Sequence, residues 1–146
     1  MESTLHSILQ DKHEALYTVS PDAKVQEAVN VMTESSVGCV LIMNHGRLEG
    51  VFTERDLMCR VVYAGRDPHR TPIREVMTTE IATVSPGITV AEAMTLCTQK
   101  RLRHLPVYED DTLLGIVSAG DLTKWGVRDQ QHTIEDLIKY IYGERA

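Results

Sequence analysis

A chain of 146 residues is long enough for one compact domain. Its hydrophobic fraction of 42% and charged fraction of 25% are those of an ordinary soluble globular protein. The net charge of −6 argues against a nucleic-acid partner, because domains that bind nucleic acid are usually basic over at least one face. No apolar run approaches the roughly 18 residues that a membrane span requires.

The N-terminus and the cysteines indicate the compartment. No basic region followed by an apolar stretch opens the chain, so no signal peptide is visible. Cys39, Cys59 and Cys97 are scattered and form no CxxC pair. We expect all three to be small buried apolar residues in a reducing cytoplasm, with a redox switch as the alternative.

An internal repeat is the most informative feature of the sequence. Residues 18–21 (TVSP) return 65 positions later as 83–86, and residues 50–57 (GVFTERDL) return as 115–122 (GIVSAGDL). From residue 17 to residue 57, 12 of 41 positions are identical to their counterparts, with no gap. Such a repeat predicts two copies of one supersecondary unit. Each copy alone is marginal in size, so we expect the two to share a core.

The first copy reads as β-α-β-β-α. A short strand at 17–19 ends at Ser-Pro, since proline cannot continue a ladder. From Val25 onward, apolar residues follow the i, i+3, i+4, i+7 spacing of a helix with one buried face. Two strands at 39–43 and 48–52, joined by an Asn- and Gly-containing turn, predict a hairpin. A second helix opens at Glu54.

The second copy has the same order of elements. We expect strands at 82–84, 105–108 and 113–117, a helix over 90–97, and a helix that opens at Ala119. Thr89 and Glu92 have the spacing of a capping box, which closes the first amides of a helix. The first copy has Lys24 in place of Thr89 and so loses this box, although Glu27 is kept.

Two segments lie outside the copies. The charged stretch 66–70 predicts a linker, after which Thr71-Pro72 starts a short helix. After Gly126 we expect a separate final helix from Thr133, with Ile134, Leu137, Ile138 and Ile141 on one face, ending at Gly143. The predicted organisation is repeat 1 at 8–65, a linker at 66–72, repeat 2 at 73–127 and a C-terminal helix within 128–146.

Both copies end in the motif Gly-φ-φ-(Thr/Ser)-x-x-Asp, where φ is apolar. The motif places a strand before a helix N-terminus, where free amides and the helix dipole favour a phosphate. The hydroxyl of Thr53 or Ser118 can add a donor, and the carboxylate of Asp56 or Asp121 can accept two hydrogen bonds from a ribose diol. Each pair is also spaced as a capping box. Because the whole motif occurs twice, two related sites explain it better than capping alone.

The TVSP starts, the strand Arg103-His104-Leu105-Pro106-Val107 and the endings GVFTERDL and GIVSAGDL resemble a tandem cystathionine-β-synthase (CBS) domain pair, or Bateman module, from about Gln10 to Gly126. This resemblance implies an α+β fold: two β-α-β-β-α repeats packed sheet to sheet about a pseudo-two-fold axis, here with an added C-terminal helix. It also implies a stand-alone regulatory module that senses AMP, ADP, ATP, NAD(H) or S-adenosylmethionine in clefts between the repeats.

The resemblance also assigns ligand-binding roles. Thr53 and Ser118 would contact phosphate, and Asp56 and Asp121 would hold ribose hydroxyls. The remaining positions are base-pocket residues Thr18, Val19, Thr83 and Val84, and the strand residues Arg103, His104, Leu105 and Pro106. Arg103 and His104 match a position that often contacts phosphate. The first copy has Gly38-Cys39 there, so we expect the two sites to differ in affinity or ligand.

Some alternatives stay open at this point. Arg55 either reaches phosphate or is a solvated charge of the first helical turn. The chain is expected to be a homodimer that acts on an effector protein, with no metal site and no membrane or nucleic-acid partner. A ligand-free dimeric scaffold is the second hypothesis. We do not expect an enzyme, because the sequence has no recognisable nucleophile–base pair.

Overall fold

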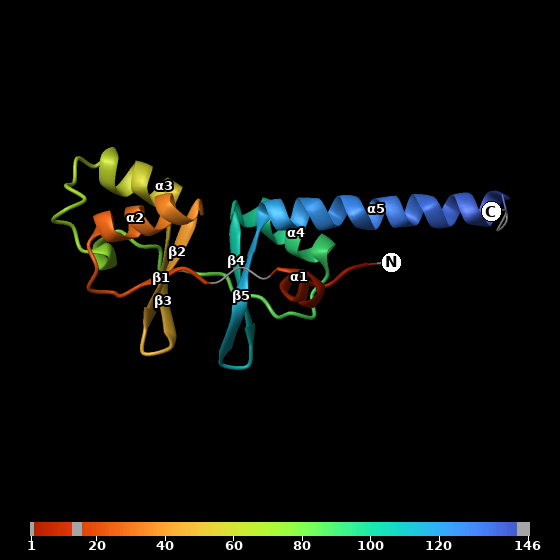
Figure 1. Ribbon diagram of the computed structural model, residues 1–146, viewed down its shortest axis with the longest axis horizontal. Coiled ribbons are helices and arrows are strands. Elements are labelled where there is room, and N and C mark those ends of the chain that lie inside the picture. Colours follow the sequence, from red (N-terminus) through yellow and green to blue (C-terminus); the bar gives the residue numbers. More distant parts are fainter. Residues whose placement is uncertain (1, 13–15, 143–146) are drawn as a thin grey trace. The chain divides into compact units, whose positions relative to one another are not determined.

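The computed structural model describes residues 2–12 and 16–142, which fall into two compact units (Figure 1). The first-repeat unit is the continuous stretch Glu14–Ile81. The second-repeat unit combines Ala82–Ala146 with the N-terminal segment Met1–His13. Each unit is a small sheet with helices, so the α+β class predicted from the sequence is confirmed.

The first-repeat unit has a three-stranded sheet in the order β1-β2-β3. Strand β1 runs parallel to β2, and β2 pairs antiparallel with β3. The elements are β1 (Thr18–Val19), α2 (Val25–Ser35), β2 (Cys39–Asn44), β3 (Arg47–Thr53), α3 (Glu54–Asp56), the π-helical turn η1 (Leu57–Val62) and the 3-10 turn η2 (Ile73–Glu75). Its core joins the inner face of α2 to the sheet and to the segment after the linker, through Val25, Phe52 and Ile73, each fully buried.

The second-repeat unit repeats this order around the hairpin β4-β5. Its elements are α1 (Leu5–Asp11), α4 (Val90–Lys100), β4 (His104–Glu109), β5 (Thr112–Ser118) and α5 (Ala119–Tyr142). The strand predicted at 82–84 does not form: only Val84 pairs, through a single parallel bridge to Val107, in the place where β1 meets β2 in the other unit. Leu5 and Ile8 of α1 are buried in the same core as Leu105 and Leu122. The N-terminal helix is thus part of the second-repeat unit.

The two copies share details of backbone conformation even at positions where their residue types differ. Both hairpins shift register at the same place, between Ile42 and Met43 and between Val107 and Tyr108. The helix ahead of each hairpin ends in a left-handed residue, Ser36 with φ 54° and Arg101 with φ 53°. A left-handed end lets the last carbonyls of the helix be satisfied before the chain turns into the strand.

In the first copy Glu27 still accepts from the N–H of Lys24 at 3.5 Å, and carbonyls of the linker replace the missing capping hydroxyl. The N–H of Val25 donates to the carbonyl of Thr71 at 2.9 Å, and the N–H of Gln26 donates to that of Pro68 at 3.0 Å. In α4 the hydroxyl of Thr89 accepts from the N–H of Glu92 at 3.0 Å, as predicted. The linker therefore satisfies amides of α2 that have no capping hydroxyl.

The C-terminal helix corrects one prediction. Instead of a break after Gly126 and a new start at Thr133, α5 is continuous from Ala119 to Tyr142. A Cβ at Gly126 would lie 3.1 Å from the sulfur of Met94 on α4. The glycine therefore allows α4 and α5 to pack closely, rather than ending a helix. The predicted end at Gly143 lies outside the described residues.

The cysteine prediction is correct at two positions of three. Cys39 and Cys97 are buried, and burial raises the pKa of the Cys97 thiol. Cys59 is exposed on the outer side of η1, so the prediction that it is buried is wrong. Separately, among the described residues no helix is both long enough and apolar enough to cross a membrane.

Candidate functional site

The two motif endings lie at equivalent strand-to-helix junctions. At the first junction, Thr53 ends β3 and caps α3. Its hydroxyl accepts from the N–H of Asp56 at 3.2 Å, and its own N–H donates to the Asp56 carboxylate at 3.0 Å. The N–H of Glu54 donates to the carbonyl of Gly38 at 3.1 Å. The capping-box alternative is therefore present as geometry, with aspartate in place of the usual glutamate.

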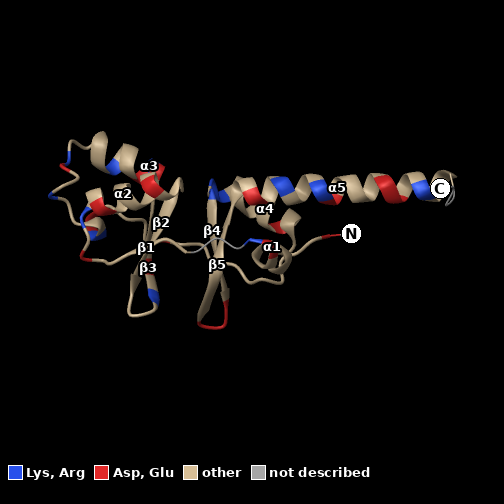
Figure 2. Cartoon of the chain, in the orientation of Figure 1, with Lys and Arg blue, Asp and Glu red and all other residues tan. Residues whose placement is uncertain are grey.

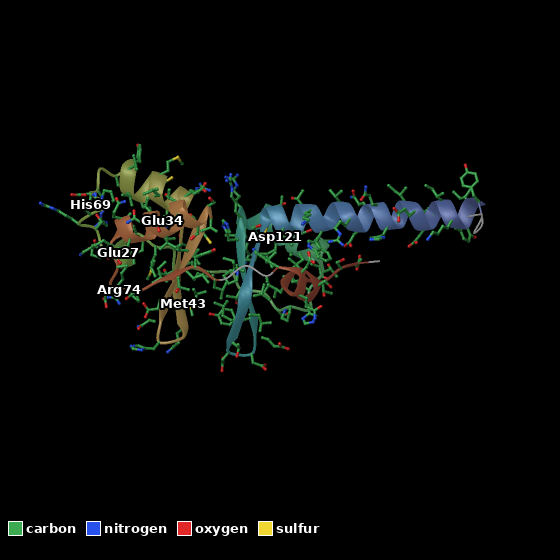
Figure 3. The ribbon with its side chains drawn as sticks, in the orientation of Figure 1. Glu27, Glu34, Met43, His69, Arg74 and Asp121 are labelled. Carbon is green, nitrogen blue, oxygen red and sulfur yellow. The ribbon has the colours of Figure 1, made fainter. Side chains whose placement is uncertain are left out.

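The second junction, where Figure 3 labels Asp121 at the start of α5, has the same hydrogen-bond pattern. The hydroxyl of Ser118 accepts from the N–H of Asp121 at 3.0 Å, and the Ser118 N–H donates to Asp121 Oδ2 at 2.9 Å. The N–H of Ala119 donates to the carbonyl of Arg103 at 2.8 Å. Thus the two hydroxyl–carboxylate pairs share one local geometry.

The two carboxylates differ in their additional hydrogen-bond and ion-pair partners. Asp56 accepts from the hydroxyl of Thr78 at 2.9 Å and lies 3.7 Å from Arg60 Nε. Asp121 Oδ2 accepts from Lys12 Nζ at 2.8 Å, and the same ammonium donates to the carbonyl of Ile116 at 3.2 Å. The side chain of Asp56 is 9% exposed and that of Asp121 is 28% exposed. Asp121 is therefore the more accessible acid.

The environment of Asp121 shifts its ionisation. Partial burial alone would raise the pKa of this carboxyl, but hydrogen bonds from Lys12 and Ser118, with the positive charge of Lys12, outweigh it. The net effect is a lowered pKa, so the carboxylate is ionised at neutral pH. An ionised carboxylate is the form that accepts two hydrogen bonds from a diol.

Lys12 and Thr78 lie outside the repeated motif, yet both contact its acids. Lys12 comes shortly before the first gapless copy (17–57) and contacts the acid of the second, whereas Thr78 comes shortly before the second copy (82–122) and contacts the acid of the first. The 65-residue shift carries Lys12 onto Met77, the neighbour of Thr78. Extending the repeat toward the N-terminus would therefore have paired these two segments.

The glycine of the motif makes room for the same segments. A Cβ at Gly50 would lie 2.5 Å from the sulfur of Met77 and 3.1 Å from the carbonyl oxygen of Thr78. At Gly115 it would lie 2.8 Å from Leu9 of α1. In each unit the motif glycine and the motif acid thus contact the same segment, residues 77–78 in the first unit and residues 9–12 in the second.

Two of the other predicted ligand residues, Thr18 and Val19, form β1, and Thr83 and Val84 are their counterparts in the second copy. Thr18 and Thr83 are exposed, while Val19 and Val84 are half-buried against the core of their own unit. Their contact with a base stays a prediction.

The residues of the predicted strand differ in accessibility. Arg103 is exposed, and His104, directly opposite Ser118 in the hairpin, is half-buried. Leu105 and Pro106 are buried, so their side chains support β4 from inside the unit. Arg55 is exposed in the first turn of α3. The roles of all five in ligand binding stay predictions.

A hollow of about 380 Å³ lies beside the first junction. It is lined by Val29, Met32, Thr33, Ser36, Val37, Gly38, Glu54 and Leu57. Glu54 and Gly38, which share a hydrogen bond at the helix start, form one wall, whereas Thr53 and Asp56 do not line it. Within the described residues, no cluster of three or more metal-ligating side chains occurs.

Comparison with known proteins identifies the repeat. A family model of the CBS domain matches residues 12–63 and again residues 73–128. The chain is 39% identical over 105 residues to the CBS domain-containing protein YhcV of Bacillus subtilis, covering 72% of this chain and 74% of that protein. It is 35% identical over 127 residues to the mitochondrial CBS domain-containing protein CBSX3 of Arabidopsis thaliana, covering 84% of this chain and 62% of that one.

A solved structure of another CBS-domain containing protein has the same fold. The CBS-domain containing protein ATU1752 from Agrobacterium tumefaciens is 31% identical, superposes with a TM-score of 0.79, and the match covers 84% of this chain and 98% of that one. The repeat is thus found in the sequence, in the backbone and in the family model alike, and this chain belongs to the CBS domain family as a tandem CBS domain pair.

Proposed function

We propose that this CBS domain pair senses an adenosine-containing nucleotide (AMP, ADP, ATP, NAD(H) or S-adenosylmethionine) and relays its binding to a homodimer interface or an effector protein. CBS domain pairs are generally regulatory, ligand-binding modules. The observation that carries the proposal is the pair of equivalent junctions, each presenting a hydroxyl and a carboxylate at a helix start. The module itself is not catalytic in this proposal, and three free cysteines favour the cytoplasm.

The second junction is the better candidate for the tighter site. Its acid is the more exposed of the two, and Lys12 Nζ lies closer to Asp121 (2.8 Å) than Arg60 Nε lies to Asp56 (3.7 Å). In each helix the first and third amides are already hydrogen-bonded inside the protein. A phosphate would therefore meet the second amide, at Gly120 or at Arg55. Gly120 has no side chain to obstruct the approach.

Calorimetric titration with the five nucleotides tests the proposal. Asp121→Ala should weaken binding about ten- to a hundredfold, because hydrogen bonds to a charged group contribute about 1.5–3 kcal/mol. Asp111→Ala, in the exposed β4–β5 turn of the same unit, is the matched control and should titrate like the parent. If Asp121→Ala also titrates like the parent, the assignment of the ribose site is wrong.

A dimeric scaffold with empty sites is the competing function, and thermal or chemical unfolding separates the two. A nucleotide at 100 times its dissociation constant should stabilise a sensor by about 2.7 kcal/mol. A scaffold should be stabilised by none of the five.

A further inference from the structure

The outer part of α5 has no packing partner in the described structure. Every residue from Gln130 to Tyr142 is exposed, and Figure 1 shows this part of the helix (dark blue) running past α4 and α1 of its own unit. A helix of about a dozen residues is marginal in water by itself and depends on packing of an apolar face. This segment therefore calls for a partner.

An apolar stripe runs along this part of the helix. Its members, with their exposed fractions, are Val127 (52%), Ile134 (56%), Leu137 (55%), Ile138 (50%) and Ile141 (68%). Val127, Ile134 and Ile141 are seven residues apart and occupy position a of a heptad, and Leu137 occupies position d. A seven-residue apolar repeat on an exposed helix is the pattern of a coiled-coil seam.

The charges of the segment are confined to the opposite side. With Val127 at position a, every ionisable Asp, Glu, Lys, Arg or His side chain of 127–142 falls at b, c or f: Arg128, Asp129, His132, Glu135, Asp136 and Lys139. Figure 2 shows these charges as bands of both signs along α5. The flanking e and g positions hold only Gln131, Thr133, Ile138 and Tyr140. A symmetric pairing through the stripe therefore brings no like charges together.

We propose that residues 127–142 of α5 pair with the same segment of a second copy as a parallel, in-register, two-stranded coiled coil. β-Branched residues at a with leucine at d favour two parallel strands. Gln130 at the first d position would face its counterpart, and a polar residue in the seam fixes the register. The stripe offers roughly 1,000 Å² over both copies, near the lower limit for a specific interface, so the pairing is reversible and concentration-dependent.

Disulfide crosslinking tests the register on the full chain. In a Cys59→Ser background, which removes the one exposed cysteine of the described residues, Ile141→Cys should crosslink to itself under mild oxidation. Lys139→Cys, at the outward f position, is the matched control and should crosslink at least tenfold more slowly. Strong crosslinking of Ile134→Cys with none of Ile141→Cys would mean antiparallel pairing and would overturn the proposal, as would equal rates for Ile141→Cys and Lys139→Cys.

A second variant tests the seam itself. Adding Leu137→Asp to the Cys59→Ser, Ile141→Cys chain should lower the crosslinking rate at least tenfold, while adding His132→Asp on the outer face should leave it unchanged. An unchanged rate with Leu137→Asp would contradict the pairing. All measurements are made without nucleotide, so their outcome is independent of the proposed sensing function.

Discussion

Lys12 and Asp121 form an ion pair whose contribution depends on pH. The hydrogen bond from Lys12 helps to lower the pKa of Asp121 in the folded protein. A carboxyl whose pKa is lower in the folded than in the unfolded protein stabilises the folded state at pH values above the unfolded pKa of about 3.9. This stabilisation is lost as the pH falls through the folded pKa.

We predict that Lys12→Met lowers the free energy of unfolding by about 1 kcal/mol at pH 7, as expected for a partly exposed pair. The difference from the parent should shrink as the pH drops below about 4, since protonated Asp121 no longer needs the cation. Urea unfolding over a pH series measures this. Lys124→Met, an exposed lysine on α5, is the control. A loss that is the same at every pH would contradict the role given to the pair.

At Gly115 the absence of a side chain fixes the position of α1. We predict that Gly115→Ala destabilises the second-repeat unit by about 1 kcal/mol, because the new methyl group overlaps the end of the Leu9 side chain, which must move away. Because Leu9→Ala removes the overlap but also loses packing on the core, the double variant should be less destabilised than the sum of the two single variants, and chemical unfolding of the three variants and the parent measures this coupling. No coupling between the two substitutions would mean that the overlap is not the cause.

At the scale of elements, the C-terminal ends of α2 and α4 adopt a conformation that suits glycine better than the residues present. Arg101 is exposed and has φ 53°. We predict that Arg101→Gly stabilises the protein by about 0.5–1 kcal/mol, since a left-handed conformation costs a non-glycine residue roughly 1–2 kcal/mol. Lys100→Gly, one residue earlier inside α4, should instead destabilise it by about 0.5–1 kcal/mol. Thermal unfolding compares the two, and equal signs would contradict the cap geometry.

Sequence patterns predicted the elements better than their junctions. Both hairpins and the helices at 25 and 90 follow from periodicity and turn chemistry, and the structure has the hairpin strands and the two helix starts within one residue, although α4 extends to Lys100. The continuous α5 did not follow, because glycine weakens a helix in isolation, whereas at Gly126 close packing against Met94 decides. The motif likewise predicted the acids of the site, but their partners Lys12 and Thr78 come from segments brought in by tertiary structure.

At the scale of the whole molecule, the boundaries of the compact units differ from the boundaries of the repeats in the sequence. The first-repeat unit includes residues up to Ile81, among them the buried Ile73 and Val76. We predict that a fragment of residues 14–81 folds cooperatively, whereas one of residues 1–65 does not, because it lacks those core residues and carries an α1 without its own core. Circular dichroism with urea titration measures both. Cooperative unfolding of the shorter fragment would contradict this division.

The placement of α1 also sets a sequence of events during synthesis on the ribosome. Leu5 and Ile8 are translated before the first-repeat unit, yet the core that buries them includes Val117 and Leu122, and Lys12 bonds to a carboxylate 109 positions later. The stretch Glu14–Ile81 can complete its core while the rest of the chain is still being translated. The helix α1 must wait until Val117 and Leu122 have been made, so closing this long-range contact is expected to be the slow final step in folding the second-repeat unit.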